Sequence, residues 1–431
     1  MEIEMNSFIR NQFPALKLKI KGIPVAYLDG PGGYQVPERV IKAAANYLIG
    51  MDANVDGAFT SSRKTGEMIR DARQAFADFF NCSCEDVAFG ANMTTLNFAL
   101  AQALACEMIA GDRILITEID HEGNRAPWQA LQGRGIIVEE IEVDTKTCTL
   151  DMNDFKKKLS PAVKVVAVNY ASNALGTIND VKKIVELSQK MGAYTVVDAV
   201  HYAAHGTIDV KQLGTDFLLC SAYKFFGPHI GVLYAKKDVL NKLTTLRVRP
   251  QHDYAPYKIE TGTLDHEGIA GAAEAVEFVA EVGEKFGKKF MPDKGEPIFN
   301  RRNKIVAGLK IFESYEKELT EYLVDELSKI EKVKIYGPPN GHPRTSTVSF
   351  TYNGYTPHEI AEYFDSKAIF VWDGDFYATR LIERLGLKDS GGLIRIGIAP
   401  YNTKEELKRL IEALQDERAL ESFVNTQKRR S

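Results

Sequence analysis

The chain has 431 residues, of which 45% are apolar and 26% charged, with a formal net charge of −4. This length predicts two or three domains with a sizeable core, and the near-neutral charge gives no reason to expect nucleic acid or a membrane surface as partner. Five cysteines without metal-type spacing, no apolar stretch of about 20 residues and no signal-peptide pattern together favour a cytoplasmic protein that acts on small molecules.

The N-terminal part of the chain predicts helices separated by a glycine-rich turn. Apolar residues recur at helical spacing in three segments, residues 6–13, 38–49 and 65–80. Between the first two helices, a short strand at residues 26–29 runs into the turn Gly30-Pro31-Gly32-Gly33.

A second turn, at residues 91–95, follows a strand at residues 87–90 and precedes an alanine-rich helix that extends to about Ile109. A strand, a small polar turn and a helix present backbone N–H groups and a positive helix end, which suit a phosphate. Asn92, Met93 and Thr94 are therefore the predicted phosphate cradle.

Short apolar strands then alternate with helices, as in an α/β protein with a mostly parallel sheet. The predicted strands cover residues 113–117, 136–143, 164–168, 194–197 and 217–220, with helices at 152–159 and 181–191. A glycine-containing turn after the last of these strands predicts an antiparallel strand at residues 232–235.

Polar side chains follow several of these strands, where ligands bind in open α/β sheets. Asp198 closes one strand, and Lys224 follows the next after Ser221-Ala222-Tyr223. An acid and a lysine in these places fit pyridoxal phosphate (PLP) chemistry: the lysine holds the aldehyde as a Schiff base, and the aspartate keeps the ring nitrogen protonated. Ser221 and Tyr223 can donate hydrogen bonds to the phosphate.

Two further strand ends carry candidate site residues. His121 follows the strand at residues 113–117, at the same edge as Asp198 and Lys224, where an imidazole can stack on the cofactor ring. Asn173 follows the strand at residues 164–168, and its amide can hold a phenolic oxygen or a carboxylate.

The C-terminal part predicts a smaller α/β unit. Its strands are predicted at residues 333–336, 347–350 and 369–372, and its helices at 298–314, 315–330, 357–367 and 404–415. A helix at residues 268–282 and an exposed connection at 285–297 precede it, and the tail at 421–431 is predicted to fray. Arg395 lies within an apolar strand, so it needs an anionic partner, most simply a substrate carboxylate.

The segments VVDAVHYAAH and SAYKFFGPHIGVLYAK resemble the cofactor core of class V aminotransferases, within PLP fold type I. The resemblance is strongest to cysteine desulfurases and their relatives, and it extends from about Ala26 to about Leu414. It implies a large domain with a mostly parallel seven-stranded sheet between helices, and a small C-terminal α/β domain. The boundaries we predict are residues 1–35 for an N-terminal segment near the active site, 36–285 for the large domain and 286–431 for the small domain.

The resemblance also implies roles for individual residues. It makes Thr94 a phosphate ligand and His121 a ring-stacking proton shuttle, and it puts Asn173 near the cofactor oxygen and the substrate carboxylate. His201 stands where cysteine desulfurases usually have a glutamine that donates to the ring oxygen. The remaining implied residues are Gly32 and Gly33 beside the substrate, Arg395 on its α-carboxylate, and Thr263, which reaches the partner subunit's phosphate across a homodimer interface.

One loop departs from the desulfurase pattern. The segment from Trp372 to Arg380 contains no cysteine, and Tyr377 stands at the place of the cysteine that stores sulfur as persulfide in those enzymes. We therefore expect a cysteine-desulfurase-like lyase on a sulfur-containing amino acid that works without a loop persulfide. Transamination, and epimerisation of the isopenicillin N epimerase type, are the alternatives. A catalytically inactive PLP-fold binding protein is a further one, against which Lys224 and Asp198 argue.

Overall fold

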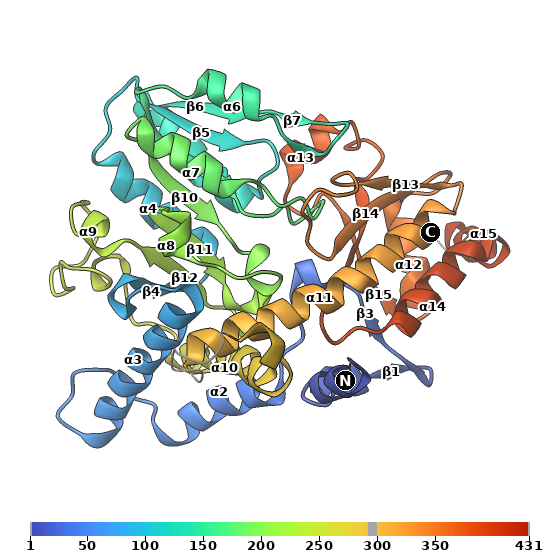
Figure 1. Cartoon of the computed structure of the whole chain (residues 1–431), viewed down its shortest axis with the longest axis horizontal. Coiled ribbons are helices and arrows are strands. Elements are labelled where there is room, and N and C mark those ends of the chain that lie inside the picture. The colour runs from blue at the N-terminus through green and yellow to red at the C-terminus, as the bar shows by residue number, and fades with distance from the viewer. Residues whose placement is uncertain (1, 292–299, 430–431) are drawn as a thin grey trace.

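The computed structural model describes residues 2–291 and 300–429. A long helix, α11 (Arg301–Ser328), extends from the helices that pack on the larger β-sheet to the smaller β-sheet (Figure 1). No helix in the described ranges is both long and apolar enough to cross a membrane.

The larger sheet has seven strands in the order β4-β12-β11-β10-β9-β5-β6. Every neighbouring pair is parallel except those of β12, which is antiparallel to β11 and β4. The strands are β4 (Val87–Gly90), β5 (Arg113–Thr117), β6 (Ile137–Ile141), β9 (Val163–Asn169), β10 (Tyr194–Asp198), β11 (Phe217–Ser221) and β12 (Gly231–Ala235). The predicted mostly parallel, seven-stranded sheet is confirmed.

Helices cover both faces of this sheet because its strands are apolar on both sides. On β5, Ile114 and Ile116 belong to a core cluster with α4 (Met93–Ala105), whereas Leu115 belongs to the cluster on the opposite face. The opposite cluster includes residues of α3 (Thr60–Phe80), α7 (Val181–Lys190) and α10 (His266–Phe286). The predicted sandwich of helices around the sheet is therefore confirmed.

The smaller sheet is antiparallel and has the order β13-β14-β17-β16. Its strands are β13 (Val333–Tyr336), β14 (Thr347–Tyr352), β16 (Trp372–Gly374) and β17 (Leu393–Gly397). The helices in this part of the chain are α12 (Pro357–Ser366), α13 (Thr379–Arg384), α14 (Lys404–Gln415) and α15 (Glu417–Lys428).

The first 240 residues contain further short elements outside the two main sheets. The helices among them are α2 (Glu38–Gly50), α5 (Ala126–Gln129), α6 (Met152–Lys158), α8 (Val210–Leu213) and α9 (Lys237–Leu240). The two-residue strands are β1 (Lys19–Ile20), β2 (Ile23–Pro24), β7 (Val143–Asp144) and β8 (Thr149–Leu150).

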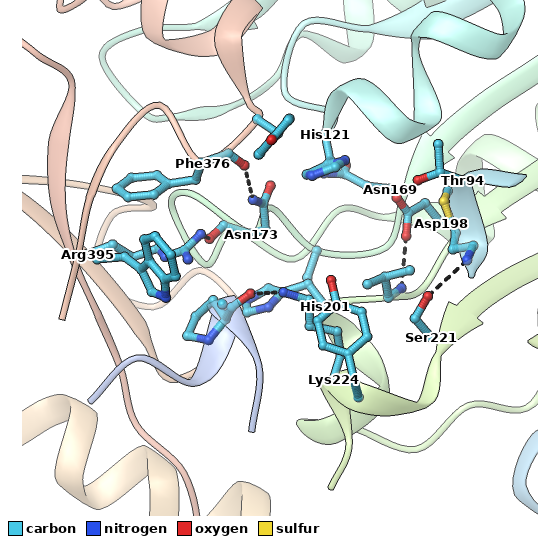
Figure 2. A pocket seen from close by; sticks show the side chains of 18 of the residues that line it. Thr94, His121, Asn169, Asn173, Asp198, His201, Ser221, Lys224, Phe376 and Arg395 are labelled. Atoms are coloured by element: carbon cyan, nitrogen blue, oxygen red, sulfur yellow. Dashed lines mark hydrogen bonds between the residues drawn. The ribbon is translucent and has the colours of Figure 1, made fainter. Parts of the chain in front are cut away.

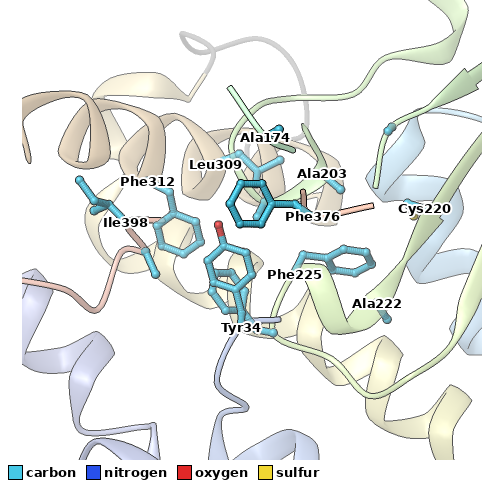
Figure 3. Packing of buried hydrophobic residues seen from close by; sticks show 14 of the residues in the cluster. Tyr34, Ala174, Ala203, Cys220, Ala222, Phe225, Leu309, Phe312, Phe376 and Ile398 are labelled. Atoms are coloured by element: carbon cyan, nitrogen blue, oxygen red, sulfur yellow. The ribbon is translucent and has the colours of Figure 1, made fainter. Parts of the chain in front are cut away.

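The N-terminal segment packs against the C-terminal half of the chain. Strand β3 (Ala26–Tyr27) pairs in parallel with β15 (Ile369–Phe370), and α1 (Glu2–Arg10) donates hydrogen bonds from Asn6 to the carbonyls of Pro400 and Asn402. Tyr34 then enters a buried cluster with Phe312 of α11, shown in Figure 3. Cys220 lies in the same core and is fully buried, as its position in an apolar strand indicates.

Four local predictions were wrong. The two helices predicted between residues 298 and 330 are the single helix α11, because no glycine or proline stands at the predicted junction, where Tyr315 is buried. Residues 298 and 299 lie outside the described ranges. The strand predicted at 369–372 is divided between two sheets, since β15 pairs with β3 and β16 with β17. Most of the tail predicted to fray lies in α15, which buries Leu420 and Val424, whereas residues 430 and 431 lie outside the described ranges. The first helix spans Glu2–Arg10 rather than residues 6–13.

The connection predicted at residues 285–297 begins later than expected. Helix α10 continues to Phe286 and a short 3-10 turn follows at Lys288–Phe290. The rest of that connection, from residue 292, lies outside the described ranges.

Candidate active site

A cavity of about 730 Å³ lies between the carboxyl ends of β9, β10 and β11 and the loop that follows β16. In Figure 2, Thr94, Asp198 and Ser221 lie on one side of it, and Arg395 and Phe376 on the other. The predicted site residues that line it are Gly32, Asn92, Met93, Thr94, His121, Asn173, Asp198, His201, Ser221, Tyr223, Lys224, Tyr377 and Arg395.

Two predicted site residues lie elsewhere. Gly33 is beside the Tyr223 ring, where an added Cβ would stand 3.3 Å from Cδ2, and it does not line the cavity. Thr263 lines a separate cavity together with Arg70 and Val248. Within one chain, therefore, Thr263 is not part of the wall around Lys224.

The predicted phosphate cradle is the N-terminus of α4. The Asn92 side chain caps this helix by accepting a hydrogen bond from the Thr95 N–H at 2.9 Å. The Met93 N–H donates to the Ser221 hydroxyl at 3.0 Å, which links the cradle to the end of β11. Gly231 permits this contact, because a Cβ there would lie 2.4 Å from the Asn92 carbonyl carbon. The helix end and the hydroxyls of Thr94 and Ser221 together suit a phosphate.

Asp198 lies at the end of β10, opposite Asn169 at the end of β9. It accepts a hydrogen bond from the Val200 N–H at 2.9 Å and is 5% exposed. Burial raises the pKa of Asp198 to about 6, although this hydrogen bond and the nearby Lys224 oppose the rise. A protonated ring nitrogen facing this carboxylate would stabilise its charged form further.

Lys224 lies just beyond β11 and points toward the glycine-rich turn. Its ammonium group donates to the carbonyl of Pro31 and lies 4.6 Å from the centre of the Tyr223 ring. Burial, assisted by the charge of Arg395, lowers the pKa of Lys224 to about 7. A large fraction of this amine is therefore unprotonated at neutral pH, as a nucleophile toward an aldehyde must be.

His121 is held in one tautomer. Its Nδ1 accepts a hydrogen bond from the Gly123 N–H at 2.9 Å, so the neutral ring carries its proton on Nε2. Burial, with a contribution from Lys224, lowers the pKa of His121 to about 4, which keeps the ring neutral near pH 7. The Tyr377 ring stacks on it at a centroid distance of 5.5 Å.

Arg395, on β17, is a buried cation without a salt bridge in the described ranges. It is 3% exposed, donates to the carbonyl of Asn173 at 3.1 Å and lies 4.1 Å from the centre of the Phe376 ring. Its Nε and the amide oxygen of Asn173 are buried without a hydrogen-bond partner in the described chain. Burial lowers the pKa of Arg395 to about 9, so it remains charged at neutral pH. The charge of Asp29 opposes this fall in the pKa of Arg395, but no salt bridge joins the two residues in the described ranges. A buried guanidinium without a directly bonded carboxylate indicates a place for an anion.

The loop after β16 closes the cavity and is fixed at several points. The Asn173 amide donates to the carbonyl of Phe376 at 2.8 Å, and the Glu122 N–H donates to that of Tyr377 at 2.7 Å. Phe376 and Tyr377 both have left-handed backbone angles, with φ of 57° and 55°. Just beyond this loop, Arg380 of α13 forms salt bridges to Glu118, which follows β5, and to Glu140 of β6. Both partners belong to the part of the chain that carries the larger sheet, here called the large-sheet half.

Sequence reasoning missed Asn169 and His229 of the cavity wall. It singled out the loop from Trp372 to Arg380, but of the loop residues on the wall it proposed only Tyr377 as a site residue, and not Trp372, Asp373, Asp375 or Phe376. Asn169 ends its strand in the same way as Asp198, so its position did carry a signal. His229 stacks on Tyr223 at 4.8 Å, and Trp372 packs on Gly32, where a Cβ would overlap the indole. The contact of Trp372 with Gly32 joins segments far apart in sequence and had no local signal.

The sequence model for the family described as Aminotransferase class-V matches residues 26–289 and 304–410. The chain belongs to this family. Class V aminotransferases are PLP-dependent, so the chain is a PLP-dependent enzyme, and the predicted family and cofactor are confirmed.

Cysteine desulfurases are among the most similar class V proteins. A probable cysteine desulfurase of Halalkalibacterium halodurans is 31% identical over 423 residues, which cover 94% of this chain and 96% of that protein. The cysteine desulfurase of Pectobacterium carotovorum is 28% identical over 424 residues, again 94% of this chain and 96% of the relative. The solved structure of the apo cysteine desulfurase from Thermococcus onnurineus has a TM-score of 0.83 at 27% identity, covering 95% of this chain and 97% of that one. Fold type I is thereby confirmed.

The groups on the cavity wall of this class V enzyme fit PLP. The N-terminus of α4 and the Ser221 hydroxyl suit its phosphate, the carboxylate of Asp198 suits its ring nitrogen, and the amine of Lys224 suits its aldehyde. When bound, PLP supplies an electron sink that stabilises negative charge at a substrate carbon.

Proposed function

We propose that this class V enzyme is a lyase that releases sulfide from a sulfur-containing amino acid and uses Lys224 to hold PLP. With cysteine as substrate, the net reaction would convert cysteine and water to pyruvate, ammonia and hydrogen sulfide. The similarity to cysteine desulfurases supports a sulfur-containing substrate.

The observation that carries the proposal is that Arg395 and Lys224 line one cavity. Arg395 has no salt bridge in the described ranges, and the amide oxygen of Asn173, whose backbone carbonyl accepts a hydrogen bond from Arg395, has no hydrogen-bond partner in the described chain. A carboxylate bound by Arg395 would direct the rest of an amino acid toward Lys224. This arrangement supports an amino-acid substrate.

Lys224 and His121 can assist the reaction in different ways. The amine of Lys224, with a pKa of about 7, can accept the proton from the substrate α-carbon. His121 presents a neutral ring with a proton on Nε2, so it can donate a hydrogen bond that stabilises charge on a departing group, but it does not transfer that proton. Lys224 is therefore the base of the proposed reaction, and His121 a hydrogen-bond donor.

The cavity provides no thiol to accept sulfur. All five cysteines lie in the described ranges, and none of them lines the cavity. Tyr377 stands on the loop where desulfurases carry their cysteine, and its backbone carbonyl is bonded to Glu122. We therefore infer that sulfur leaves as free sulfide and is not stored on the protein.

The test distinguishes elimination, transamination and epimerisation by the products that the enzyme forms. The purified holoenzyme is incubated with cysteine, cystine, homocysteine and alanine, and sulfide, keto acid and exchange of the α-proton for deuterium are followed. Sulfide and keto acid in equal amounts would support the lyase. Keto acid formation that requires an amino acceptor would establish transamination instead, and α-proton exchange alone would establish epimerisation. A protein-bound persulfide would contradict the route to free sulfide.

We further propose that the enzyme is a cytoplasmic homodimer in which Thr263 contributes to the partner's site. Several large apolar side chains are exposed on the large-sheet half, including Ile49 at 82%, Leu246 at 73% and Val248 at 56%. Val248 and Thr263 line the same second cavity. Sedimentation velocity would test this directly, because a monomer at micromolar concentration contradicts a shared site.

A further inference from the structure

Two buried histidines on the large-sheet half contact one short segment of the C-terminal half. His201 and His205 flank a 3-10 turn (Tyr202–Ala204) and are 6% and 5% exposed. The segment Thr345-Ser346-Thr347, which leads into β14, contacts both of them. No metal-type cluster of side chains occurs in the described ranges, so this histidine pair calls for another explanation.

The contacts alternate along the segment, as side chains do on extended backbone. The hydroxyls of Thr345 and Thr347 each lie 3.0 Å from Nε2 of His201. Ser346, between them, contacts Nδ1 of His205 at 3.2 Å and donates to the Glu316 carboxylate at 3.0 Å.

The second histidine serves to anchor the segment. Nδ1 of His205 lies 2.6 Å from the Glu316 carboxylate of α11, so it carries a proton, and Nε2, 2.8 Å from the Tyr34 hydroxyl, can accept one. His205 thus connects the large-sheet half to α11, the N-terminal segment and the strand that contacts His201. The positions of Thr345 and Thr347 are well determined by this network.

Counting hydroxyl hydrogens settles the tautomer of His201. Thr345 has a second acceptor, the Gly176 carbonyl at 3.5 Å, whereas the only described partner of the fully buried Thr347 hydroxyl is Nε2 of His201. If Nε2 carried the proton, the hydrogen of Thr347 would be buried without an acceptor, which is unfavourable. Nε2 therefore accepts from Thr347, and the proton of the neutral ring lies on Nδ1.

The protonated Nδ1 of His201 is free to donate a hydrogen bond to a molecule in the cavity. His201 and Lys224 both line the cavity, where Figure 2 shows them. Nδ1 of His201 has no hydrogen-bond partner in the described chain, and it is not one of the unpartnered polar atoms that are fully buried. The ionisable groups whose charges His201 feels are His205, Arg395 and Lys224. Burial, together with these neighbours, keeps the pKa of His201 well below its usual range, so the ring is neutral.

We propose that Thr347 is a positioning residue that fixes His201 as an Nδ1–H donor toward the ring oxygen of PLP. A hydrogen bond to this oxygen stabilises its negative charge, which is greater when the lysine–cofactor nitrogen has lost its proton. The small sheet thereby sets the pH at which that nitrogen titrates. The inference rests on Lys224 holding the cofactor, but the tautomer itself can be measured without it.

The test compares Thr347→Val with two matched variants. Thr347→Ser keeps the hydroxyl, and Thr345→Val removes the neighbouring hydroxyl, which the hydrogen count makes dispensable. Histidine tautomers are read from ring ¹⁵N chemical shifts in the labelled holoenzyme, with His201→Gln assigning the signal. We expect an Nδ1–H tautomer in the wild type and both matched variants, and a change to Nε2–H in Thr347→Val.

A second readout is the pH dependence of the visible band of the lysine-bound cofactor. Loss of the donor in Thr347→Val should raise the midpoint by about one pH unit, whereas Thr347→Ser and Thr345→Val should stay within a few tenths of the wild type. An Nε2–H tautomer in the wild type, or equal midpoints in Thr347→Val and Thr347→Ser, would overturn the inference. A protein without a visible band would instead contradict the role of Lys224, and the ¹⁵N result would still decide the tautomer.

Discussion

The two walls of the cavity are built in different ways. The cofactor wall comes from neighbouring strands of one sheet, whose register brings Asn169, Asp198 and Ser221 to the same edge. The substrate wall is assembled from a glycine-rich turn, Arg395 in the middle of β17 and the loop at Phe376, held together by hydrogen bonds across the two halves. Cofactor binding is therefore a property of the sheet, whereas the choice of substrate depends on how separate segments meet.

The largest effect should come from the cofactor wall. Lys224→Ala should abolish the visible absorption of the lysine-bound cofactor and lower kcat by at least about a thousandfold, because it removes both the covalent anchor and the base. Absorption spectra and steady-state rates measure this. A variant that keeps the wild-type band would show that another amine holds the cofactor, and the distinction between the walls would fail.

On the substrate wall, Arg395→Gln should raise KM for the amino acid about 100-fold and leave the cofactor band in place. The reason is that loss of a buried charge-assisted pair costs about 3 kcal/mol. Arg395→Lys is the matched control, since a lysine keeps the charge but cannot form the bidentate hydrogen bonds of a guanidinium to a carboxylate. It should give an intermediate KM. Loss of the cofactor band in Arg395→Gln would place this residue on the cofactor wall instead.

The pKa of Lys224, lowered by burial to about 7, predicts the pH dependence of cofactor capture. Only the unprotonated amine reacts with the aldehyde, so the rate at which apoenzyme takes up PLP should rise as pH increases through about 7. Between pH 6 and pH 8 the increase should be about tenfold. Stopped-flow absorbance measures it, and a rate that rises only above pH 9 would mean that the amine has an ordinary pKa.

The smallest effect should come from the ion pairs that fix the loop. Arg380→Gln removes the bridges to Glu118 and Glu140, and because Arg380 is 38% exposed we expect only a few-fold increase in KM, with faster proteolysis near Tyr377. Lys388→Gln is the matched control, since its partner Glu383 lies on α13 itself. Equal proteolysis in both variants would show that the bridges do not hold the loop.

Most of the cofactor wall could be predicted from the sequence, because each of its residues follows an apolar strand that is recognisable on its own. Asp198 and Lys224 are of this kind, and the cavity contains both. The substrate wall could be predicted only in part. Arg395 stood out as a charge within an apolar strand, but the contact of Trp372 with Gly32 depends on β16 joining β17, which periodicity does not reveal.

The continuous helix α11 has a mechanical consequence. At 28 residues it is a rod about 42 Å long that carries the buried Glu316 near its middle. A hinge between the large-sheet half and the C-terminal half cannot lie within this continuous helix. Any rotation of one half relative to the other would therefore move α11 as a rigid unit about its contact with His205. Hydrogen exchange should therefore find α11 protected along its whole middle, with substrate-dependent changes confined to the loop at Phe376 and Tyr377.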